Sequence, residues 1–194
     1  MTLPVALVTG FGPFLDVTDN PSERLARALD GREHAGLRVV GRVLPVSYAR
    51  APAALAEALD ALRPRCVVAM GAGKDDVDVE LVARNRVGSP HPDCDGHGRV
   101  GDLLDAAGPD ARRPAAAVEA RLRAWLSRAD DGGPRSARAS EDAGGYVCNA
   151  LYYALLGHGV ERAVFVHLPR RPDALAFANA QALILSALGH LAAI

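Results

Sequence analysis

Short apolar runs alternate with longer amphipathic segments along most of the chain. Runs rich in Val, Leu and Ala, several of them closed by Gly or Pro, predict buried strands at 5–9, 37–44, 66–70 and 160–167. Apolar residues at helical spacing predict helices at 21–29, 51–62, 114–126 and 172–188. Strands that alternate with helices indicate an α/β fold, with a largely parallel, twisted sheet flanked by helices on both faces.

Length and composition narrow the class of protein further. The 194 residues suffice for one domain with a sizeable core, which we expect to span 1–194. With 49% hydrophobic residues and a net charge of −1, the chain has no basic field for nucleic acid or an anionic membrane. No apolar run approaches the length of a bilayer span, and the N-terminus lacks a signal-peptide pattern. The three cysteines are widely separated and imply no disulfide framework, so we expect a cytoplasmic protein with reduced thiols.

Cys148 is a candidate nucleophile because of the residues that surround it. Gly144 and Gly145 allow a sharp turn, and apolar residues then recur at helical spacing as far as Gly157. Cys148 therefore falls in the first turn of a helix, where free N–H groups and the helix dipole favour a thiolate. The alternative is that Cys148 is a small buried residue between a helix and the sheet.

His167 and Glu80 are the candidate partners of this cysteine. His167 lies at the carboxyl end of a predicted strand, where ligands bind in parallel sheets. Alternation at 77–83 predicts a strand with one polar face, on which we expect Glu80 to be exposed and solvated. A cysteine nucleophile needs a histidine, and that histidine needs an acceptor that orients it. A short strand at 135–139 is expected to lead into the cysteine turn.

A glycine-rich loop follows the first predicted strand. Gly10-Phe11-Gly12 suggests a dinucleotide-binding loop, but Leu15 replaces the third glycine of that motif and Pro13 interrupts the turn. The two phenylalanines of this loop, Phe11 and Phe14, either form an apolar pocket wall or cover the core.

The loop at 89–101 contains the spacing His91-x-x-Cys94-x-x-His97, which is suited to a transition metal. Structural zinc usually requires a second ligand pair, which the sequence does not offer. A polar surface loop is the favoured interpretation, and we expect neither a metal nor a cofactor.

Four segments carry the pattern of a family by their residues, order and spacing. They are GFGPF at 10–14 with NPS at 20–22, VELVARN at 79–85, AGGYVCN at 143–149 and VFVHLP at 164–169. Together they resemble the opening, glutamate, cysteine and histidine motifs of pyroglutamyl peptidase I, also called pyrrolidone-carboxylate peptidase. The resemblance extends over nearly the whole chain.

The resemblance implies a cysteine exopeptidase that removes N-terminal pyroglutamate from peptides through a thioester. Cys148 would be the nucleophile, His167 the general base and acid, and Glu80 the carboxylate that orients it. The Cys148 N–H would stabilise the oxyanion, and no cofactor would be required. The residues implied for substrate binding are Phe11, Phe14, Tyr146 and Val147, with the backbone of Gly71 and Ala72 at the lactam amide. Members of the family often form homo-oligomers.

The sequence departs from the family pattern around the expected pocket. Pro90 replaces an arginine for which Arg84 and Arg86 are possible substitutes, and Cys94 replaces an asparagine. Leu15 and Asp16 replace glycines, and the turn from Gly71 to Lys74 is shorter, with Lys74 at the position of an arginine. These changes leave two alternatives open, a cysteine amidohydrolase with shifted specificity and a non-catalytic binding homologue.

Overall fold

A seven-stranded sheet organises the structure, a computed structural model that describes residues 2–73, 76–127 and 137–193. Its strands, in spatial order, are β2 (Glu33–His34), β3 (Leu37–Leu44), β1 (Val5–Phe11), β4 (Cys66–Ala72), β9 (Ala163–Leu168), β5 (Val77–Glu80) and β8 (Ala137–Ser140). Pairs β3–β1, β1–β4, β4–β9 and β5–β8 are parallel, whereas β2–β3 and β9–β5 are antiparallel. The largely parallel sheet expected from the sequence is therefore confirmed.

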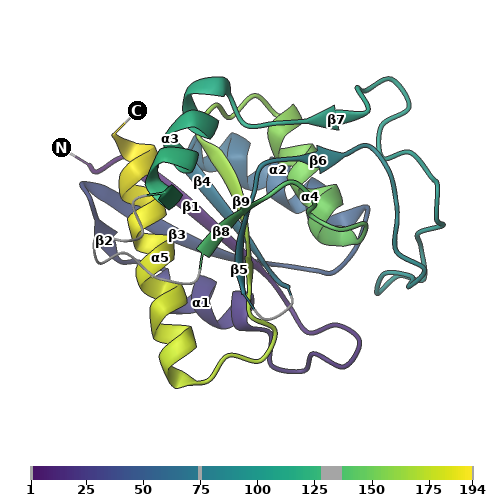
Figure 1. The fold of residues 1–194 in the computed structure, drawn as a ribbon, viewed down its shortest axis with the longest axis horizontal. Helices are drawn as coiled ribbons and strands as arrows, with labels where there is room; N and C mark the ends of the chain where they lie inside the picture. Colours follow the sequence, from purple (N-terminus) through teal and green to yellow (C-terminus); the bar gives the residue numbers. More distant parts are fainter. Residues whose placement is uncertain (1, 74–75, 128–136, 194) are drawn as a thin grey trace.

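Helices cover both faces of the sheet (Figure 1). They are α1 (Pro21–Leu29), α2 (Arg50–Leu62), α3 (Ala116–Ser127), α4 (Val147–Gly157) and α5 (Ala174–Ala192). The buried residues of α1, α3 and α5 pack on one face, and those of α2 and α4 pack on the other. Because strand side chains alternate between faces, Val68 of β4 joins the first cluster and its neighbours Val67 and Ala69 join the second. A small second sheet pairs β6 (Ala83–Arg84) with β7 (Ala111–Arg112).

Several element ends differ from the expected ones. The predicted strand at 77–83 ends at Glu80, where the chain leaves the large sheet. Helix α4 ends at Gly157, but its C-cap is His158 and the glycine in the left-handed conformation is Gly159, at φ +87°, where Gly157 is the cap expected from the sequence. Residues 135–136 of the expected short strand lie outside the described residues, and the rest of it is β8.

Helix α5 corrects one expectation about apolar segments. Its 19 residues, with a mean hydropathy of 1.4 over an 18-residue stretch, are long and apolar enough to cross a bilayer. Its buried residues, however, pack on the sheet together with the core residues of β1, β4 and β9. Length and composition alone therefore do not distinguish this core helix from a membrane span.

Close packing between β1 and α1 gives a test of the fold. An added Cβ at Gly10 would lie 2.0 Å from the carbonyl oxygen of Ser22, whereas one at Gly12 meets nothing closer than 3.9 Å. We expect Gly10→Ala to lower the free energy of unfolding by at least about 1–3 kcal/mol, because backbone must move to admit the methyl group. Gly12→Ala is the matched control and should stay within about 0.5 kcal/mol of the wild type. Urea denaturation measures both, and equal stabilities for the two variants would contradict the packing described.

Candidate active site

A two-glycine turn sets the start of α4. Gly144 has φ +74°, a conformation that favours glycine. An added Cβ at Gly145 would lie 2.4 Å from the Cα of Gly88, so the two backbones are in direct contact. Helix α4 then begins after Tyr146, which places Cys148 in its first turn as expected.

The carbonyl of Gly145 is held by three donors. It accepts hydrogen bonds from the N–H groups of Gly88 and Ser89, at 2.8 and 3.0 Å, and from the Tyr48 hydroxyl at 3.3 Å. These bonds fix the peptide plane that leads into the helix. None of the three donors was identified from the sequence, because they lie 56 or more residues from Gly145 and no local pattern marks them.

Asn149, the residue after Cys148, ties α4 to the segment after β5. Its side chain accepts from the Arg84 N–H at 2.8 Å and donates to the carbonyls of Arg84 and Arg86, at 2.8 and 3.2 Å. The side chain is 1% exposed, so these bonds satisfy a buried amide. The sequence marks Asn149 as part of the cysteine motif, but it does not indicate that its side chain bonds the backbone of Arg84 and Arg86.

His167 and Glu80 form a buried pair on the α4 face of the sheet. The Nδ1 of His167 lies 2.7 Å from Oε1 of Glu80. In the antiparallel register of β5 and β9, Glu80 is opposite Phe165 and therefore diagonal to His167 on the same face. The expectation that Glu80 is exposed is wrong, since its side chain is only 1% exposed. The polar face of β5 is covered by α4, whose Tyr152 hydroxyl donates to the Glu80 carbonyl at 2.8 Å.

The surroundings of His167 favour its charged form. Burial alone would lower the pKa of His167, but its interactions with Cys148 and Glu80 outweigh burial and raise the pKa to about 10. The folded-state pKa lies above the ordinary value of 6.5, so this stabilisation is fully present below pH 6.5 and is lost as the pH rises towards 10. At neutral pH the raised pKa keeps the His167 ring in its imidazolium form, next to Glu80 and the Cys148 sulfur.

Two glycines make room for the site on β4 and just beyond it. An added Cβ would lie 2.6 Å from the Cys148 Sγ at Gly71, and 2.8 Å from the Cβ of His167 at Gly73. The absence of side chains there lets both groups lie against the sheet. Lys74, which the sequence placed at the end of this turn, lies outside the described residues.

An apolar recess opens next to the Cys148 side chain. Its lining residues are Phe11, Phe14, Asn20, Val46, Ala72, Tyr146, Val147 and Cys148. The aromatic rings of Phe14 and Tyr146 lie 6.0 Å apart. Five of the six residues implied for substrate binding thus line this recess, and the sixth, Gly71, lies under the sulfur. Asn20 and Val46 were not expected.

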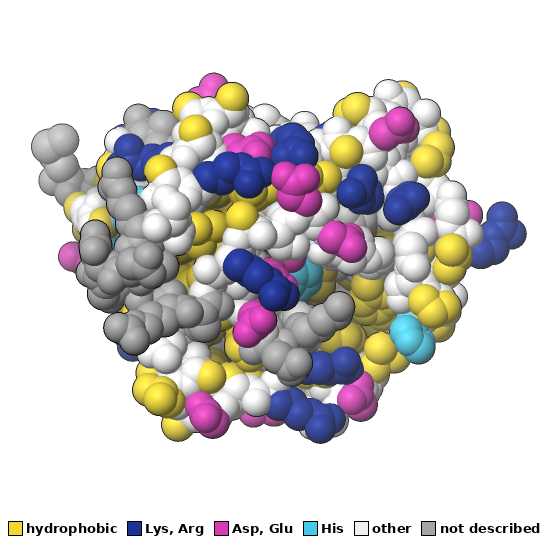
Figure 2. Space-filling model, in the orientation of Figure 1, with side chains coloured by type: hydrophobic (Ala, Val, Ile, Leu, Met, Phe, Trp, Pro, Cys, Tyr) yellow, Lys and Arg dark blue, Asp and Glu magenta, His cyan; other side chains and the backbone are white. Residues whose placement is uncertain are grey.

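A larger cavity of about 950 Å³ continues from this recess over the buried pair. Cys148, His167 and Glu80 all line it. Figure 2 shows a hollow near the middle of the molecular face, with apolar surface inside and both basic and acidic side chains on its rim. Among the described residues, two arginines line the cavity, Arg138 and Arg170. The Arg84 and Arg86 proposed from the sequence are exposed elsewhere.

The loop at 89–101 is organised by one aspartate. The Asp93 carboxylate accepts from the N–H groups of Tyr48, Asp95 and His97 at 2.7, 2.9 and 2.8 Å. Cys94 contacts the Arg50 guanidinium, with 3.1 Å between nitrogen and sulfur. Within the described ranges, no group of three His, Cys, Asp or Glu side chains is placed to hold a metal ion.

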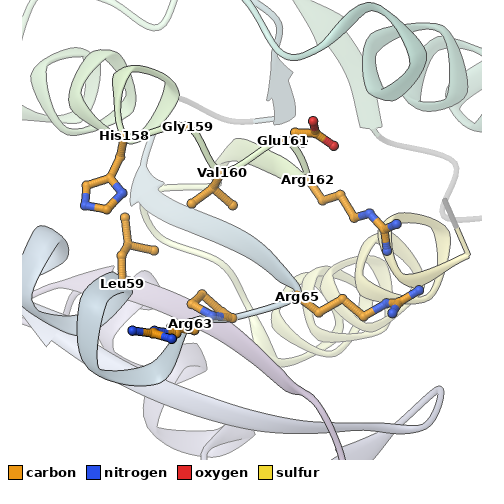
Figure 3. Close-up of a pocket in the computed structure, with 9 residues that line it drawn as sticks. Leu59, Arg63, Arg65, His158, Gly159, Val160, Glu161 and Arg162 are labelled. Atoms are coloured by element: carbon orange, nitrogen blue, oxygen red, sulfur yellow. The ribbon is translucent and has the colours of Figure 1, made fainter.

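A second groove lies at the opposite end of the strands. It has a volume of about 320 Å³ and is lined by the segments that precede β4 and β9. Figure 3 shows Arg65 and Arg162 extending side by side toward α5. Both donate to the Ala192 carbonyl at the end of α5, at distances of 3.2 to 3.5 Å. These arginines therefore cap a helix, and the described residues that line the groove include no cysteine, serine or threonine.

Comparison with known proteins gives a consistent result. The family model described as pyroglutamyl peptidase matches residues 5–186. Pyrrolidone-carboxylate peptidase of Chromobacterium violaceum is 40% identical over 176 residues, which cover 88% of this chain and 80% of the relative. The corresponding protein of Mycobacterium tuberculosis is 36% identical over 182 residues, covering 88% and 79%.

Solved structures show the same fold. Pyroglutamyl peptidase I from Bacillus amyloliquefaciens superposes with a TM-score of 0.86 and 26% identity, covering 98% of each chain. Pyrrolidone carboxyl peptidase from Thermococcus litoralis gives a TM-score of 0.85 and 28% identity, covering 97% of this chain and 93% of that one.

The α/β fold places a cysteine at the start of α4 and a histidine, hydrogen-bonded to a carboxylate, on the next strand in the chain, β9. This arrangement is that of a cysteine hydrolase. The comparisons with known proteins identify the family within this class. The chain belongs to the pyroglutamyl peptidase family, a family of cysteine peptidases.

Substitution of Gly71 tests the contact between β4 and the thiol. We expect Gly71→Ala to displace the Cys148 sulfur, because the new methyl carbon would lie 2.6 Å from it. A displacement of about 1 Å can lower the rate of a reaction at such a site by about a hundredfold. The rate of alkylation of Cys148 by iodoacetamide, followed by mass spectrometry, measures the effect. Circular dichroism provides the control for folding, and an unchanged alkylation rate in a folded variant would refute the contact.

Removal of the Glu80 charge tests the pKa of His167. In Glu80→Gln, that pKa should fall, so the proton shared by the two groups moves from the imidazole towards the Cys148 sulfur and less thiolate remains. We expect alkylation of Cys148 at pH 6.5 to slow by about tenfold or more, since each unit by which the pKa of His167 falls shifts the proton equilibrium between imidazole and thiol by a factor of ten. At pH 9.5 the rates of wild type and variant should converge, because free thiols ionise without a cationic partner there. Parallel pH profiles would show that Glu80 does not act through this charge.

Proposed function

We propose that this chain removes N-terminal pyroglutamyl residues from peptides, with Cys148 as nucleophile and His167 as acid and base. The observation that carries the proposal is the 2.7 Å contact between His167 and the buried Glu80, next to a cysteine at a helix start. Glu80 occupies Nδ1, so Nε2 is the ring nitrogen available to the thiol and the substrate.

Acyl transfer follows from this arrangement. The Cys148 thiolate attacks the carbonyl carbon that joins the pyroglutamyl ring to the next residue. The first hydrogen bond of α4 runs from the Ala150 N–H to the Tyr146 carbonyl, so the Cys148 N–H lies in the free first turn. That N–H accounts for one donor to the oxyanion. The imidazolium of His167 then gives its proton to the leaving amine, and the C–N bond breaks.

Deacylation uses the same groups, with the proton transfer to and from His167 reversed. Neutral His167 accepts a proton from a water molecule as the water attacks the thioester carbonyl. The C–S bond breaks, pyroglutamate leaves, and the thiolate and imidazolium are restored. Glu80 stabilises the imidazolium in both half-reactions and keeps the ring oriented. None of these steps requires a cofactor or a metal.

The apolar recess supports the choice of acyl group. A pyroglutamyl residue has a small, flat, uncharged ring, and the rings of Phe11, Phe14 and Tyr146 line the recess beside the sulfur. The lactam amide would meet the backbone of Gly71 and Ala72.

We place the protein in the cytoplasm, where a thiol nucleophile remains reduced, and expect no nucleic acid or membrane partner. We also propose that the protein forms homo-oligomers, and the only support for this is its membership of the family.

Release of a fluorescent amine from a pyroglutamyl amide tests the function. We expect thiol-dependent cleavage of this amide and none of the alanyl or prolyl amides. Cleavage of another small acyl amide instead would favour the amidohydrolase of shifted specificity. If nothing is cleaved and Cys148 resists iodoacetamide, the chain is a non-catalytic binding homologue.

Substitution of the nucleophile tests the mechanism. Cys148→Ser should lower kcat/KM for the pyroglutamyl amide by at least about a thousandfold, because a serine hydroxyl is not ionised by the imidazolium. Cys94→Ser is the matched control, since that thiol is exposed and lies outside the cavity, and its activity should match the wild type. Full activity of folded Cys148→Ser would contradict the mechanism.

A further inference from the structure

The loop after β1 carries Phe14 into the apolar recess on a tight turn. Phe14 and Val17 exchange both backbone hydrogen bonds, at 3.1 and 2.8 Å. Leu15, at the tip, has φ +46°, which is unfavourable for a residue with a side chain. Its side chain is exposed, so apolar burial does not offset this conformation. The conformation at Leu15 is therefore held by contacts of the neighbouring residues.

Asp16 provides such contacts through ion pairs to a distant segment. Oδ1 of its carboxylate bonds Arg170, and Oδ2 lies 3.3 Å from the Arg171 guanidinium. Both arginines follow β9, three and four residues after His167. The loop that carries Phe14 is thus tied to the segment that follows the proposed acid and base. Figure 1 shows these two loops approaching each other at one end of the sheet.

Arg170 also contacts the aromatic ring itself. Its guanidinium carbon lies 5.7 Å from the centroid of Phe14, within the range of a cation–π interaction. Tyr146 lies 6.0 Å from Phe14, so the ring contacts Arg170 and Tyr146. Arg170 lines the cavity that contains Cys148 and His167.

We propose that Asp16 and Arg170 act together as positioning residues that hold Phe14 in the acyl pocket. This inference rests on the proposed function, because it assigns the pair a role in binding the pyroglutamyl ring. The pair touches neither the thiol nor the imidazole in the structure, so its effect falls on substrate binding. The side chains of Asp16 and Arg170 are 62% and 39% exposed, and salt therefore weakens the pair.

A double-mutant cycle tests the proposal with the pyroglutamyl amide. Asp16→Asn and Arg170→Gln should each raise KM about two- to fivefold, the factor that corresponds to a partly exposed ion pair. We expect kcat to change by less than about twofold, because the reacting groups are untouched. In the double variant, KM should rise by less than the product of the two single effects, since both substitutions break the same ion pair. Arg99→Gln, an exposed arginine paired with Asp102 away from the cavity, is the control and should match the wild type.

Salt and hydrogen exchange give readouts that separate positioning from folding. Raising NaCl from 0.05 to 0.5 M should raise KM of the wild type by a similar factor and leave Arg170→Gln almost unchanged. The amides of Phe14 and Val17 should exchange faster in both single variants, with no change in the amides of β4 and β9.

Different outcomes refute the positioning role of Asp16 and Arg170 and the proposed function. Unchanged KM and exchange in the single variants, additive effects in the cycle, or a loss confined to kcat would each refute the pair as a positioning element. If the wild type cleaves no pyroglutamyl amide, the proposed function fails. Hydrogen exchange in the turn would then still decide whether Asp16 and Arg170 hold Phe14.

Discussion

Burial of the Glu80 carboxylate beside His167 is the interaction on which the rest of the site depends. A carboxylate that is 1% exposed is costly unless a cation compensates it, and the imidazolium 2.7 Å away supplies that charge. Oε2 of Glu80 has no hydrogen-bond partner among the described residues, so the carboxylate relies on the histidine. Burial raises the pKa of Tyr152, which stays a neutral donor to the Glu80 carbonyl and adds no competing negative charge.

This pair explains the topology around it. β9, the last strand in the chain, lies between β4 and β5, and the antiparallel β5 places Glu80 diagonal to His167. Both side chains then face α4, whose first turn carries Cys148. The glycines at 71 and 73 follow from the same constraint, since side chains there would occupy the space of the sulfur and the imidazole.

Local signals in the sequence were enough to predict much of the fold and part of the site. The turn before Cys148 and the strand end at His167 are marked by adjacent residues, and the structure places both as expected. Burial of Glu80 could not be predicted, because an alternating pattern does not reveal which element covers the polar face. The roles of Asn149 and Asp93 were missed for a related reason: each depends on backbone groups distant in sequence, 63 to 65 residues away for Asn149 and up to 45 for Asp93. Side chains that bond remote backbone leave no periodic trace.

Charges on the cavity rim bear on what the site selects. Arg138 is paired with Asp78 at 2.6 Å, and Arg170 is paired with Asp16. Each of these two arginines is thus paired with an acidic side chain, which reduces the field that it presents to an acyl group. Pro90, exposed where the family pattern has an arginine, adds no cation. Under the proposed function, selection depends on the shape and apolar surface of the recess. The described residues that line it include no acidic partner for the free ammonium group of an ordinary amino acid, whereas a flat, uncharged lactam needs none.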